Sequence, residues 1–207
     1  MTTFLLIRHG LHELGGDRIA GRMPGVHLSE AGRAQAERLV GRLDGVRIDA
    51  LLCSPMERTV ETATPLSEAR GLELRRCEQL LEIDYGEWTG ARLDDLDGDP
   101  RWRAWNEYRS GHRVPGGESM VEVQARAVSL LRDLAGERPD GVIALVSHGD
   151  VIKSAVAHLL GAPLDLFLRI EISTASITAV AVGELGPWVL CVNNTAELAQ
   201  LPLPSPS

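Results

Sequence analysis

Short runs of consecutive apolar residues recur along the chain and predict the strands of a sheet. Several of these runs are apolar almost throughout, a pattern typical of strands buried on both faces. The last two runs are joined by a short turn with glycine and proline, which predicts a hairpin. The expected strands are residues 3–7, 50–53, 72–74, 142–146, 176–182 and 188–192.

The segments between these runs carry the start and stop signals of helices. Ser29 is expected to cap a helix with an apolar side that includes Ala34 and Leu39. A second helix is expected to have Pro55 at its first helical position and to end before Gly71. Two further helices are expected over residues 119–134 and from about 150 to 160.

The alternation of strands and helices predicts an α/β fold, a three-layer sandwich with a mostly parallel central sheet and helices on both faces. We expect residues 1–207 to form a single domain. Residues 77–117 break the pattern and are expected to form a small inserted lid. Residues 200–207 are rich in proline and are expected to form a loose tail. Ligands of such sheets bind beyond the carboxyl ends of the strands, which is where chemistry is expected.

Composition narrows the class of protein. The formal net charge of −8 makes nucleic-acid binding by bulk electrostatics unfavourable, and no apolar run is long enough to cross a bilayer. The N-terminus lacks a basic leader, and Cys53, Cys77 and Cys191 form no CxxC pair. We therefore expect a cytoplasmic protein with no nucleic-acid or membrane partner. Lys153 is its only lysine.

Two of the apolar strands end in a His-Gly pair, with His9 preceded by Arg8 and His148 preceded by Ser147. Both histidines are expected at the same edge of the sheet. Arg58 is expected in the first turn of a helix at that edge, where free N–H groups and a partial positive charge suit an anion. This convergence predicts a pocket for a phosphoryl group.

The charges of these groups suggest their roles. Arg8 and Arg58 can pair with the equatorial oxygens of a phosphoryl group in transfer. A neutral imidazole can attack phosphorus, so His9 is the expected nucleophile, with its other ring nitrogen donating to the carbonyl of Gly10. His148 is expected to stabilise the transferring oxygens.

A carboxyl group is needed to protonate the leaving oxygen and later to activate water. Glu82, at the start of the lid, is the best candidate, and a neighbouring phosphate would raise its pKa. The rival interpretation is a metal site, although the two arginines would repel a cation, so no metal and no cofactor is expected. Its ligands would be His9, Glu82, His148 and Asp150.

Five motifs carry a resemblance to the histidine phosphatase superfamily, the phosphoglycerate mutase-like group, over residues 3 to about 193. They are Arg8-His9-Gly10, Ser54-Pro55-x-x-Arg58, Glu82-x-x-x-Gly86-x-Trp88-x-Gly90, Gly116-Gly117-Glu118-Ser119 and Ser147-His148-Gly149. The resemblance implies a phosphohistidine mechanism without metal and the roles given above. It also implies that the backbone at Ala20, Gly21 and Gly149 lies beside the substrate phosphate.

The loop after the nucleophile departs from the family pattern. His12 replaces a small hydroxyl residue, and the usual Asn is missing. His12 and Arg18 either take over as donors to the phosphate or face solvent. Glu118 either orients Arg8 or a site histidine, or only favours the N-terminus of a helix.

The lid is rich in tryptophan and arginine. Trp102 and Trp105 share a helical face and are expected to pack together. Most lid arginines are expected to face solvent, the alternative being that one or two reach an anionic tail of the substrate.

The segment after Glu82 is short and acidic, which resembles the phosphatase branch of the superfamily rather than the mutases. We therefore expect a phosphoric monoester hydrolase that acts on small phosphorylated metabolites. A phosphoglycerate mutase-type phosphomutase and a non-catalytic phosphate-binding module are the alternatives. The hairpin edge is a candidate surface for a homodimer.

Overall fold

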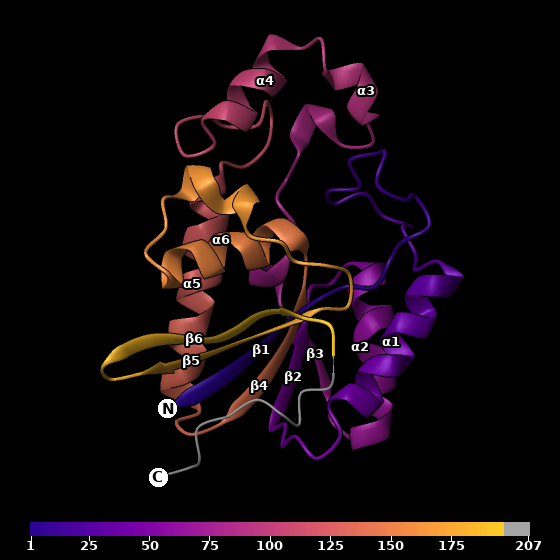
Figure 1. Ribbon diagram of the computed structural model, residues 1–207. Coiled ribbons are helices and arrows are strands. Elements are labelled where there is room, and N and C mark those ends of the chain that lie inside the picture. Colours follow the sequence, from indigo (N-terminus) through magenta and orange to yellow (C-terminus); the bar gives the residue numbers. More distant parts are fainter. Residues whose placement is uncertain (197–207) are drawn as a thin grey trace.

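The structure is a computed structural model that describes residues 1–196, so the predicted tail lies outside the described residues. One six-stranded sheet has the order β3-β2-β4-β1-β5-β6 (Figure 1). The first four strands in this order are parallel, and β5 and β6 are antiparallel to their neighbours, which confirms the mostly parallel sheet. The strands are β1 (Thr2–Arg8), β2 (Ala50–Cys53), β3 (Leu74–Arg76), β4 (Val142–Ser147), β5 (Ile177–Gly183) and β6 (Gly186–Asn194).

Helices cover both faces of the sheet, as the apolar strands require. In β1, Leu5 and Ile7 pack against α1 and α2, whereas Phe4 and Leu6 point to the other face and pack with α5 and α6. Each face removes apolar side chains from water, the main favourable term in folding. The covering helices are α1 (Glu30–Arg42), α2 (Glu57–Arg70), α5 (Met120–Glu137) and α6 (Gly149–Leu159).

The segment between β3 and α5 lies beyond the carboxyl ends of the strands, where Figure 1 shows it at the top of the molecule. It contains α3 (Leu93–Leu96), α4 (Pro100–Glu107) and two short 3₁₀ helices. Trp105 is fully buried and stacks on Trp102, with ring centroids 5.4 Å apart, so the predicted packing of these rings is confirmed. A third 3₁₀ helix, Leu164–Arg169, was not predicted and places Phe167 in the same apolar cluster.

The prediction that α2 has Pro55 at its first helical position is wrong. Ser54 continues the ladder of β2, its amide donating to the carbonyl of Val146, and the helix begins at Glu57. The third strand also starts two residues later than predicted. Gly71 ends α2 in the left-handed region, φ 60°, and Leu72 still bonds back to the helix.

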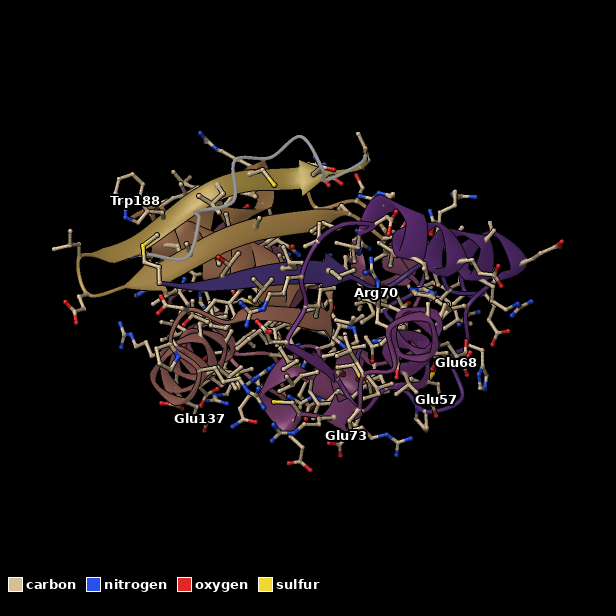
Figure 2. The ribbon with its side chains drawn as sticks, turned by 90° about the horizontal axis from the view of Figure 1, so that it is seen from below. Glu57, Glu68, Arg70, Glu73, Glu137 and Trp188 are labelled. Carbon is tan, nitrogen blue, oxygen red and sulfur yellow. The ribbon has the colours of Figure 1, made fainter. Side chains whose placement is uncertain are left out.

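The hairpin of β5 and β6 is confirmed, and β6 is the outer strand of the described sheet. Trp188 stands on β6 with 58% of its surface exposed (Figure 2). A second copy of the chain at this edge stays a prediction. Among residues 1–196, none of the helices combines the length and the apolar composition needed to span a membrane.

The start of α1 lies in close contact with the loop that follows β1. Ala34 is exposed rather than buried, and the inner side of the helix is made by Gly32, Ala36 and Leu39. A Cβ atom on Gly32 would lie 2.0 Å from the carbonyl oxygen of Leu11. The prediction for Ala34 fails because this close approach, which the helical pattern does not reveal, turns Gly32 toward the loop and leaves Ala34 facing solvent.

Substituting Gly32→Ala is therefore expected to destabilise the fold by roughly 1–3 kcal/mol, as overpacking does. The matched control is Gly41→Ala in the same helix, where nothing lies within 4 Å and the backbone is ordinary. There the higher helix propensity of alanine should stabilise by about 0.5–1 kcal/mol. Urea unfolding of both variants measures the difference, and equal stabilities would show that the contact is not tight.

Candidate active site

The pairing of the parallel strands brings the two His-Gly pairs together. Arg8 at the end of β1 is in register with Ser147 at the end of β4, so the next residue of each strand is a histidine at one edge. The ring centroids of His9 and His148 are 5.2 Å apart. This edge therefore gathers both imidazoles, although they lie far apart in sequence.

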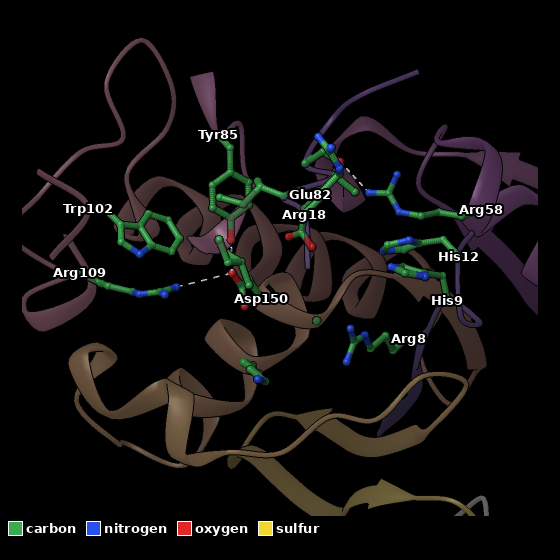
Figure 3. Close-up of a pocket in the computed structure, with 16 residues that line it drawn as sticks. Arg8, His9, His12, Arg18, Arg58, Glu82, Tyr85, Trp102, Arg109 and Asp150 are labelled. Carbon is green, nitrogen blue, oxygen red and sulfur yellow. Dashed lines mark hydrogen bonds and ion pairs between the residues drawn. The ribbon is translucent and has the colours of Figure 1, made fainter. Parts of the chain in front are cut away.

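A cavity of about 300 Å³ opens at this edge (Figure 3). Of the residues predicted for the site, all except His148 line this cavity. The predicted residues in its wall are Arg8, His9, Ala20, Gly21, Arg58, Glu82 and Gly149.

His9 is held in one tautomer. Its side chain is buried, and Nδ1 lies 2.7 Å from the carbonyl oxygen of Gly10, a hydrogen bond in which the ring must donate. The lone pair is then on Nε2. Burial, and secondarily the positive charge of Arg58, hold the pKa of His9 well below its usual value, so the ring is neutral near pH 7.

Two arginines present unused donors next to this ring. Arg58 is 1% exposed, and its Nη2 donates to the carbonyl oxygen of Gly21 at 2.7 Å. Arg8 donates from Nη1 to the carbonyl oxygen of Ile172 at 2.6 Å. Among the described residues, Nε and Nη1 of Arg58 and Nε of Arg8 have no hydrogen-bond partner. Buried cations without a carboxylate are costly, so this arrangement suits an anionic ligand.

His148 lies beneath the cavity and is fully buried. Its Nδ1 lies 3.1 Å from Nη2 of Arg58, and its Nε2 lies 2.9 Å from Oγ of Ser54. Because a guanidinium only donates, Nδ1 accepts and Nε2 donates to the hydroxyl. In this arrangement His148 contacts Arg58 on one side and Ser54, a residue of the second motif, on the other, whereas its role toward the transferring oxygens stays a prediction.

Glu82 is a mostly buried carboxyl group in the cavity wall, with 13% of its side chain exposed. Its Oε1 accepts from the amide of Ile83 at 3.0 Å, and its Oε2 lies 4.0 Å from Nδ1 of His148. Burial, and secondarily the negative charge of Asp150, raise the pKa of Glu82 to about 7. A raised pKa was expected from a bound phosphate, whereas the protein already provides it by desolvation.

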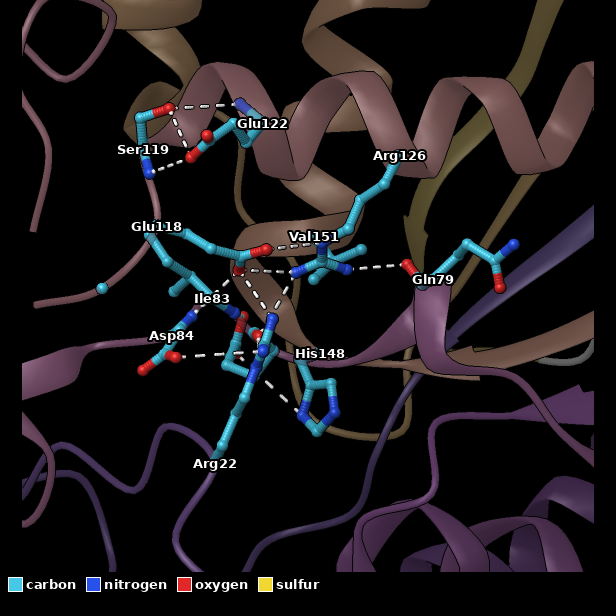
Figure 4. A network of polar contacts seen from close by, with 12 residues as sticks. Arg22, Gln79, Ile83, Asp84, Glu118, Ser119, Glu122, Arg126, His148 and Val151 are labelled. Carbon is cyan, nitrogen blue, oxygen red and sulfur yellow. Dashed lines mark hydrogen bonds and ion pairs between the residues drawn. The ribbon is translucent and has the colours of Figure 1, made fainter.

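Arg22, Arg126 and Glu118 form a network of ion pairs (Figure 4), and this network also holds the backbone of Glu82. Arg22 Nε and Arg126 Nη2 both donate to its carbonyl oxygen, at 2.8 and 3.2 Å. The carboxylate of Glu118 accepts from both guanidinium groups and from the amide of Asp84. Glu118 therefore orients the segment that contains Glu82. It does not orient Arg8 or a site histidine.

The altered loop after the nucleophile contributes to the cavity wall. His12 and Arg18 both line the cavity, which favours the donor alternative over full exposure to solvent. The ring of His12 lies 5.6 Å from that of His9, and burial lowers its pKa, so it is neutral. Arg18 donates from Nη1 to the carbonyl oxygen of Gly90.

The sequence analysis gave no role in binding the substrate to Tyr85 or Asp150 at the far end of the cavity, although it named Asp150 as a ligand of the rival metal site. The hydroxyl of Tyr85 donates to Asp150 at 2.8 Å, and Arg109 lies 3.6 Å from the same carboxylate. Asp150 directly follows the second His-Gly pair, so its position was a usable signal. Arg109 is one of the lid arginines for which contact with an anionic tail of the substrate was the alternative, but no pattern singled it out, because the irregular lid brings it to the cavity.

The rival metal interpretation lacks a suitable cluster in the part of the chain that the structure describes. No group of three or more His, Cys, Asp or Glu side chains there could hold a metal ion.

Comparison with known proteins identifies the family. The model of the histidine phosphatase superfamily, branch 1, matches residues 4–195. Phosphoserine phosphatase 1 of Hydrogenobacter thermophilus is 29% identical over 97% of this chain and 96% of its own length. The probable phosphoglycerate mutase GpmB of an Enterobacter species is 30% identical, over 91% of this chain and 88% of its own.

The solved structures agree with the predicted fold. A mycobacterial glucosyl-3-phosphoglycerate phosphatase superimposes with a TM-score of 0.83 at 27% identity, over 93% of this chain and 99% of its own. Its name and that of the Hydrogenobacter relative support the predicted class, a phosphoric monoester hydrolase acting on small phosphorylated metabolites. The family match covers nearly the whole described chain, including the strand ends that form the cavity. The chain belongs to the histidine phosphatase superfamily, branch 1.

Proposed function

We propose that this protein hydrolyses small phosphate monoesters through a phosphohistidine intermediate on His9, without a metal ion. One observation carries the proposal. A neutral imidazole, with Nδ1 bound to Gly10, lines a small cavity together with Arg8 and Arg58, whose guanidinium groups have N–H donors without a partner among the described residues. That combination supplies a nucleophile and a charge-complementary site for the transferring group.

In the first step the lone pair on Nε2 of His9 attacks phosphorus, and the bond from phosphorus to the ester oxygen breaks. Arg8 and Arg58 stabilise the negative charge on the equatorial oxygens. Glu82, with its pKa at about 7, gives its proton to the leaving alcohol oxygen.

In the second step the ionised Glu82 takes a proton from water, and the water oxygen attacks phosphorus. The bond from phosphorus to Nε2 breaks, its electron pair returns to the ring, and inorganic phosphate leaves. Glu82 is again protonated, so one carboxyl group serves both steps.

Hydrolysis of p-nitrophenyl phosphate by the purified protein tests the proposed activity. We expect turnover that does not change after treatment with a chelator. In the same experiment, 3-phosphoglycerate should give inorganic phosphate rather than 2-phosphoglycerate, with or without a bisphosphorylated primer. Primer-dependent isomerisation faster than hydrolysis would favour the mutase, and absence of any turnover would favour a phosphate-binding module.

We also propose that the protein acts in the cytoplasm on small molecules. The net charge of −8 and the three free cysteines support this proposal.

A further inference from the structure

The cavity has a second end that phosphoryl transfer does not use. Its wall there comes from the lid and from α6, and Figure 3 shows Trp102 and Arg109 across the cavity from Arg8 and His9. Two cationic side chains, Arg109 and Lys153, belong to this wall. Lys153, the only lysine of the chain, lies one turn of α6 beyond Gly149.

Arg109 is a buried cation with incomplete pairing. It is 6% exposed, and its guanidinium lies 3.7 Å from the ring centroid of Trp105, which fixes its plane. Nη2 donates to the side chain of Asn106, whereas Nε and Nη1 have no hydrogen-bond partner among the described residues. The carboxylate of Asp150 is 3.6 Å away and already accepts from Tyr85.

The balance of charge at this end is positive. Lys153 is half-buried and makes no ion pair or side-chain hydrogen bond within residues 1–196. Arg18 adds a third cation to the wall, against the single carboxylate of Asp150, since Glu82 is largely protonated below pH 7. A buried guanidinium whose Nε and Nη1 lack hydrogen bonds, together with an ammonium group that has no ion pair, favours an anion in this wall.

We infer that this end of the cavity binds a carboxylate of the substrate through Arg109 and Lys153. The inference rests on the proposed function and narrows the substrate to small phosphorylated carboxylic acids. A volume of about 300 Å³ is at the lower limit for ligand pockets, so a phosphoryl group and a carboxylate on a short carbon chain suit it better than a large substrate.

A matched pair of substrates tests the inference. 3-Phosphoglycerate and glycerol 3-phosphate differ only in a carboxylate against a hydroxymethyl group. We expect kcat/KM for the carboxylate substrate to be higher by about 10- to 100-fold, the range for a charged hydrogen bond. In Lys153→Gln and Arg109→Gln this ratio should fall toward one, and Lys153→Arg should restore it.

Arg103→Gln is the matched control, because Arg103 is an exposed lid arginine outside the cavity wall. It should leave the ratio as in the wild type. Lys153→Gln keeps the test informative if the Arg109 variant does not fold. Equal kcat/KM for the two substrates in the wild type, or an unchanged ratio in Lys153→Gln, would overturn the inference.

Failure of the proposed function gives a different result. If the wild type hydrolyses neither substrate nor p-nitrophenyl phosphate, calorimetric titration still tests the subsite. 3-Phosphoglycerate should then bind more tightly than glycerol 3-phosphate, and Lys153→Gln should remove the difference. Equal affinities of the wild type for both would overturn the subsite as well.

Discussion

Replacing His9 by alanine is expected to lower kcat for any phosphate monoester by at least about 10⁴-fold. Among residues 1–196, His9 is the only ring that combines a place in the cavity wall, a fixed Nδ1–H and a neutral Nε2 next to two arginines with unused N–H groups. Steady-state release of inorganic phosphate measures the loss. Circular dichroism should show that the variant folds.

His158→Ala is the matched control for this variant, because His158 is an exposed histidine near the end of α6 and outside the cavity wall. It should retain wild-type activity. If His9→Ala kept more than about a tenth of the wild-type kcat, the covalent mechanism would be wrong and direct attack by water would replace it.

Replacing Glu82 by glutamine is expected to lower kcat/KM for alkyl phosphates by roughly 10²–10⁴-fold, the usual contribution of a general acid. An alkoxide leaves poorly without a proton, and the amide cannot supply one. For p-nitrophenyl phosphate the leaving group needs little protonation, so kcat/KM should fall much less. Glu107→Gln, at an exposed lid position, is the matched control.

The pH dependence follows from the same group. Since the acid must be protonated and its pKa is about 7, kcat/KM for an alkyl phosphate should be highest below pH 7 and fall tenfold per unit above it. Glu82→Gln should lose this decline. If kcat/KM of the Glu82→Gln variant still declined above pH 7 as in the wild type, the decline would belong to another group.

The convergence of the site was predictable because parallel strands end at one edge. The apolar runs before His9 and His148 required buried neighbouring strands, and the register of β1 with β4 places the two rings together. The hydrogen bond from His9 to Gly10 was predictable as well, since the acceptor is the next residue in the chain.

Other parts of the site depend on contacts that no local pattern encodes. Glu118 reaches the backbone of Glu82 through Arg22 and Arg126, and these four residues come from three separate segments. The position of Arg109 depends on the irregular lid packing on Trp105. Side-chain periodicity specifies the face of a helix or strand, but not which loop closes over it.

The covalent state of His9 during turnover is the most direct measurement of the mechanism. The enzyme is mixed with an isotopically labelled phosphate ester, quenched within milliseconds, and digested for mass spectrometry. We predict a phosphoryl group on the peptide that contains His9, stable in base and lost in acid, and absent from His9→Ala. A phosphoryl group on another residue would contradict the proposed intermediate on His9. So would the absence of any labelled peptide while the wild type turns over substrate.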